Sequence, residues 1–181
     1  KIPAIKLFLE KYDHTFVVGA LVNDVLKAQG LQVGRSKVSD ELPSPAVVGH
    51  SRFVIPNDVT AQRSDGHAYV KKPHEVTADD KIVDIGPDSV ALIAPHIERA
   101  NFILWNGPTG IYEEGFVSYT HAIAEIISRR VAAGAVCRRF LEEFGIEIHS
   151  HVVAIGGVHT QPRAPETIDW RAVEESPVRC A

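Results

Sequence analysis

The stretch that decides the fold is Trp105-Asn106-Gly107-Pro108-Thr109-Gly110-Ile111-Tyr112-Glu113. It continues the apolar run at residues 102–105, which is short and bounded by turn residues and is therefore predicted to be a buried strand. Ligands in open α/β sheets bind just beyond the carboxyl ends of such strands. Glycine lets the backbone of the turn approach a ligand closely, and proline stiffens it. The stretch therefore predicts a ligand-holding turn, with an ordinary Gly/Pro turn as the alternative.

Strands and helices alternate on either side of this stretch. Strands are predicted at residues 15–18, 53–55, 82–85 and 102–105, and helices at residues 1–12, 21–29 and 87–97. Residues 34–50 are predicted to be an excursion rich in Gly, Ser and Pro, and residues 64–80 a polar surface. The alternation predicts an α/β fold, a three-layer Rossmann-like parallel sheet with helices on both faces.

The alternation fails in the last third of the chain. Residues 118–133 and 137–144 are both predicted to be helices, with Gly134 ending the first, and no strand lies between them. A strand at residues 149–155 then leads into Gly156 and Gly157. We expect the vacant strand position to leave an apolar gap or an unpaired sheet edge, which favours self-association.

Composition restricts the class of protein. The 181 residues carry a formal net charge of -4, which argues against nucleic acid as a partner, and no apolar run is long enough to cross a bilayer. The two cysteines, Cys137 and Cys180, lack any metal or redox spacing, so a cytoplasmic location is expected. The chain contains no methionine and begins at Lys1 inside a predicted helix, which indicates an incomplete protein.

The turn at residues 106–113 resembles the nucleotide-binding turn of phosphoglycerate kinases. Three further segments agree with that family in order and spacing, namely Val18-Gly19-Ala20-Leu21-Val22-Asn23 running into Leu26-Lys27-Ala28-Gln29-Gly30, Ile55-Pro56-Asn57-Asp58, and Asp84-Ile85-Gly86-Pro87. The resemblance covers residues 1 to about 157 and corresponds to the carboxyl-terminal, nucleotide-binding half of the family's chain. It implies a domain of the family's carboxyl-terminal type at residues 1–159, followed by a divergent tail at residues 160–181.

The resemblance also implies a reaction and a site. The family transfers phosphate between 1,3-bisphosphoglycerate and ADP in glycolysis, with magnesium accompanying ADP or ATP. It implies nucleotide-binding roles for Gly19, Ala20, Leu21, Asn106, Pro108, Gly110, Ile111 and Glu113. Among these, Leu21 and Ile111 would lie against the base, and Glu113 would bind the ribose. It implies catalytic roles for Lys1, which would follow the phosphoryl group, and for Gly156 and Gly157, whose amides would stabilise it. It assigns no metal ligand to this chain.

Important parts of the family's machinery are missing from the sequence. A strand and a glycine-rich phosphate loop ending in an aspartate and a hydroxyl residue would stand between Ala135 and Val136, and the amino-terminal domain that binds 3-phosphoglycerate or 1,3-bisphosphoglycerate is absent. We therefore expect the isolated chain to have essentially no transfer rate. Two alternatives stay open: a non-catalytic nucleotide-binding or interaction domain that lost its phosphate loop, and a partial or damaged coding sequence.

Several residues also have plainer interpretations. Lys1 is equally typical of a solvated charge, and Leu21 and Ile111 of ordinary core residues. Glu114 competes with its neighbour Glu113 for the ribose. The histidines of the last third invite a zinc interpretation, which lacks a cysteine or carboxylate at ligand spacing; they are His149, His151 and His159.

Overall fold

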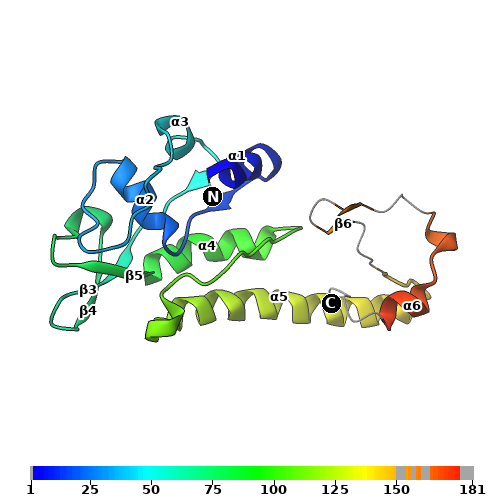
Figure 1. Ribbon diagram of the computed structural model, residues 1–181. Coiled ribbons are helices and arrows are strands. Elements are labelled where there is room, and N and C mark those ends of the chain that lie inside the picture. The colour runs from blue at the N-terminus through cyan, green and yellow to red at the C-terminus, as the bar shows by residue number, and fades with distance from the viewer. Residues whose placement is uncertain (1, 150–153, 156–157, 160–163, 176–181) are drawn as a thin grey trace. The chain divides into compact units, whose positions relative to one another are not determined.

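The computed structural model describes residues 2–149, 154–155, 158–159 and 164–175. It divides into two compact units, Lys1–Val131 and Ala132–Ala181. We call them the first and second units and describe each by itself (Figure 1).

The first unit begins with a parallel strand pair between helices. β1 (Thr15–Phe16) pairs with β2 (Phe53–Val54) in parallel, and Thr15 lies opposite Phe53. Gly19 ends the strand segment at a φ of +65°, a left-handed conformation that favours glycine. The helices around this pair are α1 (Ile2–Lys11), α2 (Leu21–Ala28) and the short α3 (Pro45–Val48). The predicted strand-turn-helix unit is therefore present.

A second sheet in the same unit is antiparallel. β3 (Val59–Gln62) lies between β4 (Ala68–Lys71) and β5 (Lys81–Ile85), and a 3-10 turn, η1 (Pro73–Glu75), joins the last two. The strand predicted at residues 82–85 forms, but it pairs with β3 instead of extending a parallel sheet. Most of residues 64–80 are exposed, as the predicted polar surface requires, but the β3–β4 hairpin within this region was not predicted. Its turn contains Asp65-Gly66, with Gly66 at a φ of +87°, which is a common hairpin signal.

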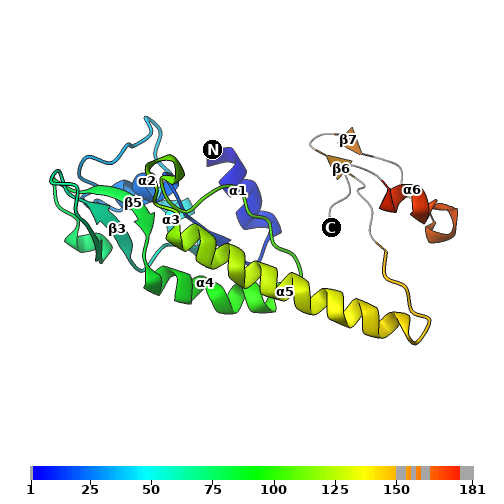
Figure 2. The ribbon, with the colours of Figure 1, turned by 90° about the horizontal axis from the view of Figure 1, so that it is seen from below.

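Two long helices pack together in the first unit. α4 (Pro87–Arg99) and the first half of α5 (Ser118–Glu142) run side by side (Figure 2), and Ile93, Ile97 and Ile123 form their buried contact. The buried carboxylate of Asp58 caps α4 by accepting hydrogen bonds from the backbone N–H groups of Asp88 (2.9 Å) and Ser89 (2.8 Å). This cap satisfies backbone donors that would otherwise lack partners at the start of the helix.

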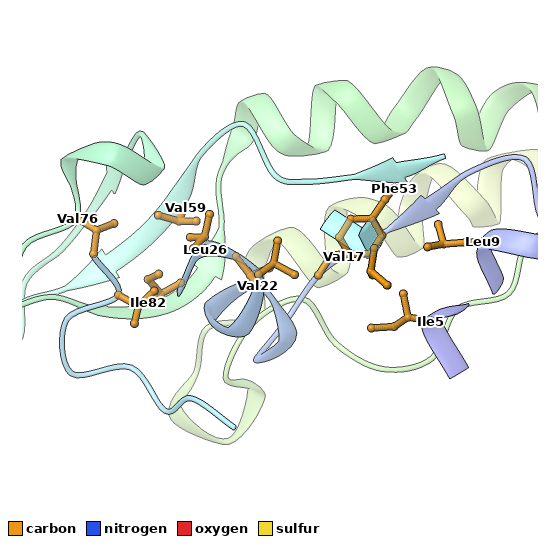
Figure 3. Packing of buried hydrophobic residues seen from close by; sticks show 12 residues of the cluster. Ile5, Leu9, Val17, Val22, Leu26, Phe53, Val59, Val76 and Ile82 are labelled. Carbon is orange, nitrogen blue, oxygen red and sulfur yellow. The ribbon is translucent and has the colours of Figure 1, made fainter. Parts of the chain in front are cut away.

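The main hydrophobic cluster joins the elements that precede α4. Apolar side chains from α1, both sheets and α2 converge in it (Figure 3), because each element turns one apolar face inward. Its buried members are Ile5, Leu9, Val17, Val22, Val25, Leu26, Val33, Val47, Phe53, Val59, Val76 and Ile82. The cluster fixes α2, and with it the loop that precedes α2.

The predicted buried strand at residues 102–105 is wrong. These residues form no strand, and the exposed fractions of Phe102 and Leu104 are 66% and 54%. A strand needs a neighbouring strand to satisfy its backbone N–H and C=O groups, and no described residues pair with this segment. Its contacts come from side chains instead: the ring of Phe102 stacks on that of Tyr12 at 5.9 Å, and Ile103 packs on the α4–α5 cluster.

The predicted helix break at Gly134 is also wrong, because α5 runs without interruption from Ser118 to Glu142. Glycine inside a helix costs about 1 kcal/mol relative to alanine, and the alanines at 132, 133 and 135 are strong helix formers. One glycine is therefore too weak a signal to end the helix. Within the part of the chain that the structure describes, no helix combines the length and the apolar composition that crossing a bilayer requires.

The second unit contains the end of α5 and several short elements. β6 (Ala154–Ile155) and β7 (Val158–His159) form an antiparallel pair, followed by η3 (Pro165–Thr167) and α6 (Trp170–Glu174). Of the strand predicted at residues 149–155, residues 154–155 form one, His149 lies outside it, and residues 150–153 lie outside the described residues. The exposed apolar side chains of this unit include Val136, Phe140 and Phe144.

Candidate functional site

The two predicted nucleotide-binding segments meet in the structure. A Cβ atom added at Gly19, in the loop between β1 and α2, would lie 3.1 Å from the carbonyl oxygen of Pro108. The β1–α2 loop and the turn at residues 106–113 therefore touch, although Gly19 and Pro108 are 89 positions apart in the sequence. The contact is between Gly19 and Pro108; Ala20 and Leu21 follow Gly19 in the chain, and Asn106, Gly110, Ile111 and Glu113 lie in the same turn as Pro108.

The turn is held on the sheet and on α5 by its own backbone. The N–H of Ile111 donates to the carbonyl oxygen of Val83 in β5 at 2.8 Å, and the N–H of Thr109 donates to Thr120 Oγ in α5 at 3.0 Å. Thr109 is 1% exposed, whereas its neighbours Asn106 and Pro108 face solvent. The turn thus has a fixed inner side and an accessible outer side, as a ligand-holding turn requires.

The two adjacent glutamates of the turn differ in their partners. Lys81 Nζ donates to both carboxylate oxygens of Glu114, at 2.7 and 2.8 Å. Glu113 is exposed, and its carboxylate has no hydrogen-bonding or ionic partner among the described residues. Its two oxygens can accept hydrogen bonds from the hydroxyl groups of a ligand. The geometry therefore favours Glu113 over Glu114 as the binding carboxylate.

The apolar candidates are half-buried. Leu21 packs against the main hydrophobic cluster, and Ile111 is partly exposed at the turn. Ala20 is exposed at the start of α2. Each leaves part of an apolar surface accessible beside the polar turn. A flat aromatic ring fits such a surface.

The residues predicted to act on the phosphoryl group cannot be compared with the structure. Lys1, Gly156 and Gly157 lie outside the described residues. Their catalytic roles stay predictions that rest on the resemblance.

A buried carboxylate under the turn was missed as a site residue. Asp84 in β5 is 5% exposed, and burial, the largest influence, raises the pKa of its carboxyl above the ordinary value. The Thr109 hydroxyl and the N–H groups of Ile85 and Tyr119 face this carboxylate and work in the opposite direction. A charged residue inside the apolar run at 82–85 was the signal that could have drawn attention to it.

The zinc interpretation gains no support from the geometry. Among the described residues, no three His, Cys, Asp or Glu side chains come together in a way that could hold a metal ion. The ring of His149 instead stacks on Trp170 at 4.7 Å, and its Nε2 lies 3.0 Å from Glu147 Oε2. His151 lies outside the described residues.

Most of the chain matches one known protein family. The family model described as "Phosphoglycerate kinase" matches residues 1–160. The chain belongs to the phosphoglycerate kinase family. The match includes both loops that meet at the candidate site, so the residues of that site lie in the region that shows the family.

Curated phosphoglycerate kinases from Francisella tularensis are among the relatives. The enzyme from subspecies tularensis (strain WY96-3418) is 32% identical over 173 residues, and the match covers 87% of this chain and 44% of the relative. The enzyme from subspecies novicida (strain U112) gives the same identity and the same coverage. The chain therefore spans less than half the length of the curated phosphoglycerate kinases that it matches.

Solved structures agree on the fold. The phosphoglycerate kinase from Coxiella burnetii superposes with a TM-score of 0.60 at 30% identity, covering 69% of this chain and 35% of that one. The enzyme from Pyrococcus horikoshii OT3 gives a TM-score of 0.54 at 18% identity, and the superposition covers 70% of this chain and 35% of that one. At this identity it supports the fold alone. The α/β Rossmann-like fold class predicted from the sequence is thereby confirmed.

Proposed function

We propose that residues 1–159 form a nucleotide-binding domain of a phosphoglycerate kinase-like phosphotransferase, which binds ADP or ATP through contacts to the base and ribose. The observation that carries the proposal is the contact between the β1–α2 loop and the 106–113 turn, a turn in which the carboxylate of Glu113 has no partner among the described residues. In this arrangement Leu21 and Ile111 offer apolar surface to the base, and Glu113 accepts hydrogen bonds from the ribose.

The proposed reaction of the whole protein is phosphoryl transfer between 1,3-bisphosphoglycerate and ADP, a step of glycolysis in the cytoplasm. The phosphoglycerate would bind to an amino-terminal domain of the full-length protein, since the 181 residues span less than half the length of the curated relatives. The family membership supports this part of the proposal. The reaction is proposed for the whole protein because the chain spans less than half the length of its curated relatives.

Magnesium would accompany the nucleotide in this proposal. The described residues hold no group of three or more His, Cys, Asp or Glu side chains that fits a metal ion, and the family's phosphate-loop aspartate has no counterpart between Ala135 and Val136. We therefore assign no magnesium ligand to this chain. Magnesium bound to the nucleotide phosphates alone adds no direct contact between the ion and the domain.

A second candidate function is non-catalytic nucleotide binding. The observation that favours it is the continuous helix α5, which occupies residues 118–142 where the resemblance calls for a strand and a phosphate loop. A domain of this kind would keep the base and ribose contacts and lack the phosphate contacts. Transfer of phosphate by the full-length protein distinguishes the two candidates.

The experiment that tests nucleotide binding uses the tryptophan beside the turn. The chain has two tryptophans, so the Trp170→Phe variant leaves Trp105 as the sole reporter. Titration with ADP should change the fluorescence of Trp105 saturably, with a dissociation constant of about 0.1 to 10 mM, because the phosphate contacts are missing. A free tryptophan amide controls for absorption by the nucleotide. The absence of saturable change at about 10 mM would contradict the proposal, and micromolar affinity would contradict the loss of the phosphate contacts.

A further inference from the structure

The underside of the 106–113 turn is a buried polar cluster that the proposed function does not use. Asp84 comes from β5, Thr109 from the turn and Thr120 from α5, and these residues are 5%, 1% and 8% exposed. Three separate parts of the chain therefore meet at one buried carboxylate. Burying polar groups costs free energy unless they are hydrogen-bonded. The parts of the chain that carry these groups are therefore held where the groups can pair.

Hydrogen bonds connect the two threonines of the cluster. The N–H of Thr109 donates to Thr120 Oγ at 3.0 Å, and the two threonine hydroxyls lie 2.9 Å apart. The Thr109 hydroxyl faces the carboxylate of Asp84, and either threonine hydroxyl can donate to the other. Asp84 also accepts from the N–H of Ile85 at 2.8 Å and faces the N–H of Tyr119. Asp84 therefore has donors facing it from β5, from the turn and from α5.

The packing around Gly110 gives an independent indication. A Cβ atom at Gly110 would lie 2.6 Å from both Cγ and Oδ2 of Asp84, and 2.5 Å from the carbonyl oxygen of Phe116. No side chain fits there without moving the turn or the carboxylate. Gly110 is therefore required by the close approach of the turn to Asp84.

We propose that Asp84, acting through the Thr109 hydroxyl, is a positioning residue that sets the place of the 106–113 turn against β5 and α5. Asp84 lies beneath the turn and does not itself contact the nucleotide. This inference rests on the proposed function only in taking the 106–113 turn as the nucleotide-binding element. The fixed turn presents Glu113 and Ile111 to the ligand before it arrives, which lowers the ordering cost of binding.

The test compares three threonine variants by amide hydrogen exchange and by ADP titration. Thr109→Val removes the hydroxyl at nearly constant volume, and Thr109→Ser keeps it. Thr60→Val is the matched control, because the Thr60 hydroxyl donates to the carbonyl oxygen of Ile85 at 2.7 Å on the other side of β5 and does not touch the turn. Thr120→Val removes the second threonine hydroxyl and serves as an independent route if Thr109→Val does not fold.

We expect Thr109→Val to speed exchange at the amides of Thr109 and Ile111 by about 10- to 100-fold, the range for losing a hydrogen bond to a charged group. ADP binding should weaken by a similar factor. Thr109→Ser should restore both values, and Thr60→Val should leave the turn unchanged. Unchanged exchange in both Thr109→Val and Thr120→Val would overturn the proposal.

A pH profile separates positioning from simple packing. The groups facing the carboxylate are the Thr109 hydroxyl and two backbone N–H groups, none of which titrates, so the profile reports on Asp84 itself. Burial raises the pKa of Asp84, so its protonation on acidification should begin at a higher pH than for an ordinary aspartate and should lower the protection factors of the turn. In Thr109→Val this step should be absent, and an equal step in both proteins would contradict the proposal. If wild-type protein shows no ADP binding, the proposed function fails while the exchange data still decide this inference.

Discussion

Glu113 and Glu114 are adjacent in the sequence but have different surroundings. Lys81 engages Glu114 through both carboxylate oxygens, while Glu113 has no partner among the described residues. We predict that Glu113→Gln weakens ADP binding by about tenfold, because a hydrogen bond to a charged group contributes roughly 1.5 kcal/mol or more. Titrations followed by amide NMR shifts measure the effect.

Glu114→Gln is the matched control for this prediction. It removes the same charge one residue away and breaks a partly exposed ion pair, whose contribution to stability is small. Its ADP affinity should stay near that of the wild type. The opposite order of the two variants would move the ribose contact to Glu114.

His96 gives the first unit a predicted pH dependence. It lies on α4 with its ring 4.4 Å from that of His14 and 5.1 Å from that of Phe16. Burial, followed by the nearby charges of His14 and Arg99, lowers the pKa of His96 below the ordinary value of 6.5. The unfolded chain therefore binds a proton more readily than the folded one, and the free energy of unfolding should fall as the pH drops below about 6.5.

The check is a pair of urea titrations at neutral and mildly acidic pH. His96→Phe keeps an aromatic ring and removes the titrating group, so its loss of stability on acidification should be smaller than that of the wild type. An equal loss in both proteins would show that other groups carry the pH dependence.

Elements were predictable where local pattern and pairing agree. The β1–α2 unit has a β-branched strand, a glycine at positive φ and an amphipathic helix in succession, and the structure contains it. The β3–β4 hairpin was missed although Asp65-Gly66 indicated it, because the polar composition of residues 64–80 outweighed that signal. The segment at residues 102–105 has the composition of a strand, yet a strand requires a partner, which local sequence does not specify.

The candidate site was predictable for a different reason. Its two loops touch at Gly19 and Pro108, which are 89 positions apart, and periodicity does not reveal such a contact; the expectation came from the family's motifs. Asp84 was missed because Thr109 and Tyr119, which face it, come from other parts of the chain. The domain boundary at residue 159 stays a prediction, whereas the first compact unit of the structure ends at Val131.

Gly134 tests the continuity of α5. Nothing lies within 4 Å of a Cβ atom added there, so alanine fits without a clash. We predict that Gly134→Ala raises the helical content and stabilises the helix by about 0.5 to 1 kcal/mol. Circular dichroism and the backbone carbon chemical shifts of residues 130–140 measure this effect. A loss of helix in the variant would instead support Gly134 as the end of a helix. Gly66→Ala is the control: Gly66 is exposed and has a positive φ, so this variant should not gain stability.

The 181-residue chain, taken by itself, should bind nucleotide without transferring phosphate. The chain spans less than half the length of its curated relatives, and the family's phosphate-loop aspartate has no counterpart between Ala135 and Val136. The loss of one preorganised charge-stabilising group costs a factor of about 100 to 1,000 in rate, so the loss of several is decisive. A coupled assay with ATP and 3-phosphoglycerate should detect no turnover above background. Turnover near 1 per second from rigorously purified protein would contradict this prediction.

The measurement that tests the central claim most directly compares adenosine with ADP on the same protein. The β1–α2 loop and the 106–113 turn are proposed to keep the base and ribose contacts, while the phosphate contacts are lost. Titrations followed by amide NMR shifts should therefore give dissociation constants for adenosine and ADP within about threefold of each other, with the shifts at residues 19–21 and 106–113. ADP binding more than about tenfold tighter than adenosine, or shifts elsewhere in the chain, would contradict the claim.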